Sequence, residues 1–164
     1  MTMGRMPFGS GLRAALGGRP RILAWASTSD GGVVAGLPDA LAVGDTGGWA
    51  TTGWEAIDHG RFDRDSATLT WSTADGDSRS VALKDLGRLP ELFVERVEAS
   101  IVAQWPVAWD GGRATIVARR NPGRADAVVR WRVVASPGSS IDTPDADRAL
   151  AEALRLAMDE WDIA

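Results

Sequence analysis

His59 is the only histidine in the chain, so it is the first residue to consider for proton transfer near neutral pH. Asp58 precedes it directly, and in a strand the two side chains would point to opposite faces. Catalysis by His59 would need a carboxylate partner, for which Asp58, Asp63 and Glu55 are the candidates. An exposed or hydrogen-bonded histidine near a turn is the simpler interpretation. An enzyme that uses His59 stays open as an alternative.

Three pairs of aspartates carry oxygen atoms of the kind that Mg²⁺ and Ca²⁺ bind. They are Asp63 with Asp65, Asp75 with Asp77, and Asp145 with Asp147. None continues into a calcium-binding loop that ends in a glutamate. The first two pairs fall in expected turns and the third in the first turn of an expected helix, where aspartate has structural uses. We therefore predict structural roles for them and no metal.

An excess of arginine marks residues 110–132, where six arginines accompany two aspartates. If the expected hairpin pairs around Gly123, strand alternation places Arg113, Arg119, Arg130 and Arg132 on one of its faces. Such a face could bind phosphate, a nucleic-acid backbone or an acidic protein surface, or it could be a solvated face with internal salt bridges. These four residues are the candidate anion-binding or partner-binding site.

The composition excludes several classes of chemistry. The chain has no cysteine, which rules out disulfides, thiolate nucleophiles, zinc fingers and iron–sulfur ligation. The motifs G-x-x-x-x-G-K-[ST] and G-x-S-x-G are absent, and so is a strand-borne G-x-G-x-x-G. The net charge of −4 argues against nucleic acid or an anionic membrane as the partner. We predict no cofactor and identify no small-molecule substrate.

The length and composition indicate one globular domain over residues 1–164. The lack of cysteine and of an export signal predicts a cytoplasmic location. A chain of 164 residues with 45% hydrophobic and 24% charged residues has the size and composition of a single domain. Its first twenty residues hold no apolar stretch of signal-peptide length, and nowhere are eighteen consecutive residues apolar. Neither export nor a membrane span is indicated.

Turn residues divide the first part of the chain into seven short extended runs. The runs are expected at residues 22–27, 33–35, 41–43, 49–57, 60–63, 68–72 and 78–83. A long helix should follow over Leu89–Gln104, because apolar residues recur every four positions and Pro90 suits a first turn. A short helix over Ser10–Leu16, capped by Ser10, should precede the strands.

The remaining residues predict a three-stranded meander and a C-terminal helix. The strands are expected at residues 105–109, 113–120 and 127–135. The helix is expected at residues 144–161, with Thr143 as its cap. Trp131 should fill the core on the face opposite the arginines. The fold class is α+β.

Three early segments carry a family resemblance. They are Arg21–Ala26 (RILAWA), Val33–Leu41 (VVAGLPDAL) and Thr52–Ile57 (TGWEAI). With the element order, they resemble the opening of bacterial pleckstrin-homology-like (PH-like) domains of uncharacterised actinobacterial proteins, over roughly residues 19–104. The resemblance implies a bent seven-stranded sheet or barrel capped by the helix at residues 89–104, to which residues 105–164 are appended.

Lipid-binding members of that family hold phosphates with basic residues in and around the first hairpin loop. The corresponding loop here, Ser27–Gly32, contains Asp30 and no basic residue. A membrane lipid is therefore not the expected ligand.

Three functions are compatible with the sequence. The first is a non-enzymatic cytosolic module for protein binding or scaffolding, whose partner is another protein or a second copy of the chain. Its basis is the lack of a paired catalytic constellation, together with edge strands that a partner could extend. The second is anion or nucleic-acid binding through the arginine face, and the third is an enzyme that uses His59.

Overall fold

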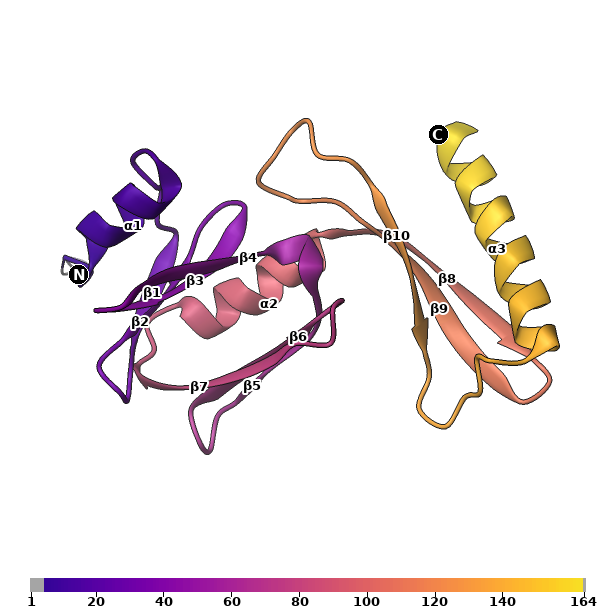
Figure 1. Ribbon diagram of the computed structural model, residues 1–164, viewed down its shortest axis with the longest axis horizontal. Helices are drawn as coiled ribbons and strands as arrows, with labels where there is room; N and C mark the ends of the chain where they lie inside the picture. The colour runs from indigo at the N-terminus through magenta and orange to yellow at the C-terminus, as the bar shows by residue number, and fades with distance from the viewer. Residues whose placement is uncertain (1–4, 164) are drawn as a thin grey trace. The chain divides into compact units, whose positions relative to one another are not determined.

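The computed structural model describes residues 5–163 and has an α+β fold (Figure 1). Its contacts divide the chain into two compact units. The N-terminal unit comprises the residues up to Ser100 together with Asn121–Ala127, and the C-terminal unit comprises Ile101–Arg120 and the residues from Val128 onward. A short segment from late in the chain thus belongs to the first unit.

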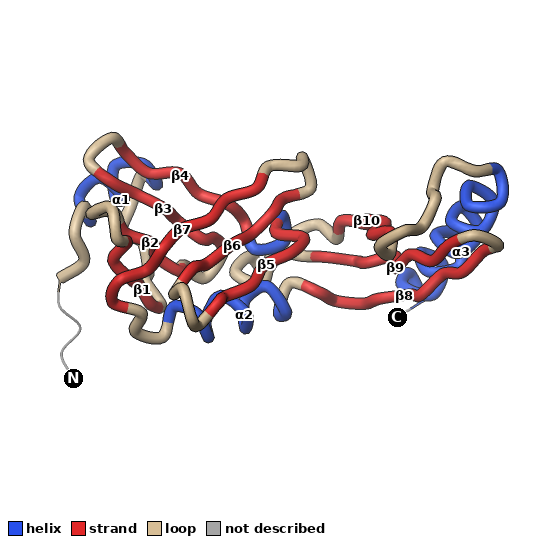
Figure 2. Tube along the Cα trace, turned by 90° about the horizontal axis from the view of Figure 1, so that it is seen from below, coloured by secondary structure: helices blue, strands red, loops and turns tan. Residues whose placement is uncertain are grey.

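A curled, seven-stranded antiparallel sheet forms most of the N-terminal unit (Figure 2). Its strands are β1 (Ala24–Thr28), β2 (Val33–Gly36), β3 (Ala40–Asp45), β4 (Gly48–Gly53), β5 (Ile57–Asp63), β6 (Thr68–Thr73) and β7 (Ser78–Asp85). Their order is β4-β3-β2-β1-β7-β6-β5, so β4 and β5 are the edge strands of a half-barrel. The seven expected strands are confirmed. The run expected at residues 49–57 is interrupted by a 3₁₀ turn, η1 (Trp54–Ala56).

Two hairpin turns of this sheet depend on glycine. Gly31 connects β1 to β2 with φ = 89°, and Gly76 connects β6 to β7 with φ = 87°. Side chains with a Cβ rarely adopt this left-handed conformation. In both turns the glycine follows an aspartate, Asp30 or Asp75, and the Asp-Gly pair is typical of hairpin turns.

Helix α2 (Leu89–Ala99) lies between the β1–β4 part and the β5–β7 part of the curled sheet (Figure 1). Its buried Phe93 packs edge-on against Trp54, with the ring centroids 6.0 Å apart. Gly60 on β5 makes room for this ring, because a Cβ there would lie 2.4 Å from it. The main core thus joins α2 to both parts of the sheet.

Helix α1 (Gly9–Leu16) packs on the other face of the sheet, against β4 and, through Leu12, against β2 and β3. Its Leu12 is fully buried in a second core that includes Val33 and Ala35, whereas Val34 points into the core under α2. Strand β2 is therefore buried on both faces. The expected cap at Ser10 is wrong, since the helix begins at Gly9 and no side chain caps it.

The expected helix over Leu89–Gln104 is too long by five residues. The structure ends α2 at Ala99 and begins strand β8 at Ile101. At the helix end, the Ser100 hydroxyl donates to the Val97 carbonyl oxygen, 2.5 Å away. The β-branched side chain of Ile101 favours a strand, and pairing with β9 overrides the four-residue apolar repeat.

A three-stranded sheet and helix α3 (Pro144–Ile163) form the C-terminal unit. The strands are β8 (Ile101–Trp109), β9 (Gly112–Arg119) and β10 (Arg130–Ala135), with β9 in the centre. Trp131 packs against Trp105 and Trp161, with ring centroids 5.2 and 6.5 Å apart, so its predicted place in the core is confirmed. The Thr143 hydroxyl accepts the Ala146 amide at 3.1 Å, as the predicted cap requires.

Candidate functional site

The four candidate arginines share one face of the three-stranded sheet. Arg119 on β9 is directly opposite Arg130 on β10, and Arg132 follows on the same face. Arg113 lies six residues from Arg119 along β9, which is about 20 Å in a strand. The structure therefore gathers three of the arginines at one end of the sheet and leaves Arg113 at the other.

These arginines differ in exposure. Arg113 and Arg130 are exposed, Arg132 is half-buried and Arg119 is buried, with 3% of its surface accessible. Strand β10 begins at Arg130 and not at residue 127, because Asn121–Ala127 packs in the N-terminal unit. The tight hairpin expected around Gly123 is wrong for the same reason.

His59 is exposed on the edge strand β5, beside a shift of register between Ile57 and His59. It lines an open hollow of about 490 Å³ with Asp58, Arg61 and residues of β6. Two of its candidate carboxylates have other partners: Glu55 accepts a hydrogen bond from Asn121, and Asp63 accepts hydrogen bonds from the amides of its own turn. Within residues 5–163, neither carboxylate forms a hydrogen bond with the imidazole of His59.

The three aspartate pairs lie in the β5–β6 turn, in the β6–β7 turn and in the first turn of α3. The Asp63 carboxylate accepts the amide of Asp65 at 2.9 Å and that of Ser66 at 3.4 Å, which lowers the pKa of Asp63 below its ordinary value. Asp145 lies 3.9 Å from Arg148 on the first turn of α3. Among the residues that the structure describes, no three His, Cys, Asp or Glu side chains group as they would around a metal ion.

The β1–β2 hairpin holds an aspartate in a small polar network. The Thr28 hydroxyl donates to the Asp30 carboxylate and accepts the Gly32 amide at 2.8 Å. The Thr28 hydroxyl and then the Gly32 amide lower the pKa of Asp30, because both hydrogen bonds favour the ionised form. The β1–β2 hairpin is therefore built around a carboxylate anion.

The lowered pKa of Asp30 predicts a pH-dependent contribution to stability. A carboxyl whose pKa is lower in the folded state stabilises the fold above its ordinary value of 3.8 and loses that contribution as the pH falls through the lowered pKa. The Asp30→Asn variant should therefore have a lower Tm than the wild type at about pH 6, and the difference should shrink below about pH 3. Thermal unfolding followed across this pH range measures it. A difference that is constant with pH would contradict the role of the charge.

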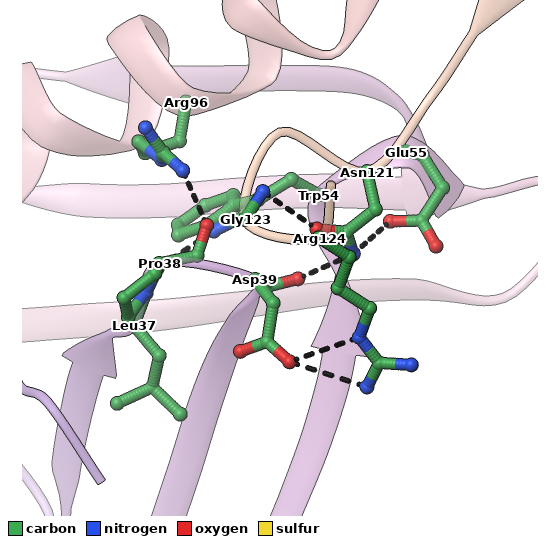
Figure 3. Close-up of polar contacts among 9 residues, drawn as sticks. All are labelled: Leu37, Pro38, Asp39, Trp54, Glu55, Arg96, Asn121, Gly123 and Arg124. Carbon is green, nitrogen blue, oxygen red and sulfur yellow. Dashed lines mark hydrogen bonds and ion pairs between the residues drawn. The ribbon is translucent and has the colours of Figure 1, made fainter. Parts of the chain in front are cut away.

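Residues Asn121–Ala127 form a strap across the β2–β3 turn of the N-terminal unit (Figure 3). The buried Asn121 amide donates to the Asp39 carbonyl and to the Glu55 carboxylate, both at 2.8 Å. Arg124 binds the Asp39 carboxylate through Nε at 3.3 Å and Nη2 at 3.2 Å. The strap is thus attached to the turn at Asp39, through its backbone carbonyl and through its side-chain carboxylate.

The β2–β3 turn is held by three different elements. Trp54 of η1 donates its indole N–H to the Leu37 carbonyl at 2.9 Å, and Arg96 of α2 donates to the Pro38 carbonyl. Asn121 completes the set at Asp39 (Figure 3). Three successive carbonyl groups therefore each accept a hydrogen bond from a side chain, which fixes this turn relative to α2 and the strap.

A groove of about 880 Å³ runs between α2 and the end of β5. Its floor is apolar and is made by Phe62 of β5, Leu86 of the loop before α2, and Pro90, Val94 and Ala99 of α2. Val94 is 43% exposed and lies beside the other apolar residues of the floor. The groove therefore presents apolar surface to solvent.

The groove borders an edge of the main sheet. Strand β5 pairs with β6 on one side only, and no described strand pairs with its outer side (Figure 2). The groove residue Phe62 belongs to this strand. Unpaired backbone groups and an apolar floor thus lie next to each other.

Sequence reasoning overlooked this groove, although one signal pointed to it. Val94 follows the core residue Phe93 and interrupts the polar side of α2 between Glu91 and Glu95. This is a weak signal, because single exposed apolar residues are common on protein surfaces and only a contiguous apolar patch marks a contact surface. The role of Phe62 depends on the meeting of β5 and α2, which the sequence does not reveal.

No helix within residues 5–163 combines the length and the apolar character needed to cross a membrane. Comparisons of the chain with protein-family models, with curated proteins and with solved structures find no match.

Proposed function

We propose that the chain is a non-enzymatic protein-binding module that holds an extended segment of a partner protein in the groove between β5 and α2. The observation that carries the proposal is the apolar groove of about 880 Å³ beside the unpaired edge of β5. A partner strand added at such an edge gains main-chain hydrogen bonds, and a neighbouring groove supplies side-chain selectivity.

The geometry suits a short segment. The edge from Gly60 to Asp63 is four residues long, which corresponds to about 13 Å of extended chain. A segment of four to six residues could pair with it while one apolar side chain enters the floor near Phe62 and Val94. A helical partner would leave the backbone groups of β5 unpaired.

The PH-like assignment of the N-terminal unit is part of the proposal. It is supported by the resemblance of three early segments and agrees with a half-barrel that has one helix between its two parts. The partner is placed at β5 because the β1–β2 hairpin contains Asp30, an anion, at the position where lipid phosphates would bind. We also propose a cytoplasmic location, which the cysteine-free sequence permits.

A peptide selection tests the proposed function. Peptides are selected on the full chain from a displayed random library, and their Kd values are measured for the wild type and for Val94→Arg. The bulky charged side chain should fill the groove floor and weaken the selected peptides by about tenfold or more.

Leu16→Arg provides the matched control, because Leu16 on α1 is also 43% exposed but lies away from the groove. This variant should bind the peptides as the wild type does. A selection that yields no peptide weakened by Val94→Arg, or peptides weakened equally by both variants, would rule out the groove as the binding site.

A further inference from the structure

Three glutamates form a row along the α2 side of the groove. Glu91, Glu95 and Glu98 are spaced at i, i+4 and i+7, so they share one stripe of the helix. All three are exposed, and the row is about 10 Å long. An occupant of the groove would therefore lie against several carboxylates.

The neighbouring arginines only partly balance this row. Arg64 lines the opposite side of the groove, and Arg88 lies 3.7 Å from Glu95. The Arg88 and Glu95 side chains are 71% and 60% exposed, so their ion pair is weak and easily exchanged. Within residues 5–163, Glu91 and Glu98 form no ion pair. The groove therefore has a net negative charge, and the carboxylates of Glu91 and Glu98 are available to a ligand.

We infer that the partner segment is basic, with two Lys or Arg residues that flank one apolar residue in the pattern basic-x-apolar-x-basic. This inference rests on the proposed function of the groove. In a strand, the two basic residues and the apolar residue point to the same face, and the basic residues are about 13 Å apart. Their long side chains can lie along the apolar floor and reach both ends of the glutamate row.

The same row disfavours other occupants. Phosphate groups of a nucleic acid or of an anionic lipid would be repelled by Glu91, Glu95 and Glu98. An acidic peptide would be repelled for the same reason. The groove therefore combines an apolar floor, which attracts many peptides, with charges that select among them.

The test uses the peptides that bind the full chain and are weakened by Val94→Arg. Among them, Lys and Arg should be enriched at positions four residues apart. Simultaneous Glu91→Gln, Glu95→Gln and Glu98→Gln should weaken the tightest such peptide about tenfold at low salt, and the loss should shrink at high salt. The control chain carries Asp75→Asn, Asp77→Asn and Glu152→Gln, which remove the same charge away from the groove and should leave Kd unchanged.

The outcomes separate this inference from the proposed function. Peptides that depend on Val94 but carry no excess of Lys and Arg, or that bind the glutamine chain as tightly as the wild type, would overturn the basic preference alone. The absence of any peptide that depends on Val94 would remove the proposed function together with the inference. Binding of a single-stranded DNA oligonucleotide or of phosphatidylserine vesicles that is lost in Val94→Arg would also overturn the inference.

Discussion

Replacing Trp54 with alanine should lower the free energy of unfolding by about 3–5 kcal/mol. The Trp54 side chain is fully buried, packs against Phe93 and donates its indole N–H to the Leu37 carbonyl at 2.9 Å. Alanine would leave a large cavity and would also leave the Leu37 carbonyl without this donor. Urea denaturation of the full chain, followed by circular dichroism, measures the loss.

Two further variants separate the causes of this effect. Trp54→Phe keeps a ring and removes the hydrogen bond, so it should cost about 1–2 kcal/mol. Trp49→Ala removes a half-buried ring from the second core and should cost less than Trp54→Ala, because less apolar surface is lost. A loss at Trp54 no larger than that at Trp49 would mean that the core under α2 does not depend on Trp54.

The Gly123→Ala variant should release the strap and destabilise the N-terminal unit by about 2–4 kcal/mol. A Cβ at Gly123 would lie 2.4 Å from the carbonyl carbon and oxygen of Pro38 and 2.5 Å from the Asp39 nitrogen. These are backbone atoms whose positions are fixed by Trp54 and Arg96, so the strap must move and not the turn. The buried hydrogen bonds of Asn121 would be lost with it.

Gly18→Ala is the matched control for this substitution. Gly18 has no atom within 4 Å of a built Cβ and has no positive φ, so alanine should be tolerated there. The amide of Gly123 donates to the Asn121 side chain at 2.9 Å, and faster hydrogen exchange at this amide would report release of the strap directly. Equal stability of the two alanine variants would contradict the close contact.

Local signals in the sequence were sufficient for most of the strands. Asp30-Gly31 and Asp75-Gly76 mark hairpins because only glycine readily adopts the backbone that these turns need. Alternation along β10 correctly separates Trp131 from Arg130 and Arg132. These features are determined by residues that are close together in the chain. They can therefore be predicted from one sequence.

The features that were missed depend on contacts between distant residues. The apolar repeat of α2 continues to Ile101, and only the pairing of that residue with Arg119 of β9 shows that the helix has already ended. Asn121-Pro122-Gly123 has the composition of a tight turn, yet its place is decided by Asp39, which lies 82 residues earlier. The groove arises in the same way, from the approach of β5 to α2.

Backbone hydrogen exchange with and without a selected peptide tests the central claim most directly. Strand addition predicts slower exchange at the outward amides of Gly60–Asp63 on β5 when the peptide is bound. The other edge strand, β4 (Gly48–Gly53), should exchange as it does in the free protein. Protection confined to β4 or to the arginine-bearing strands β9 and β10, with β5 unchanged, would contradict binding at the β5 edge.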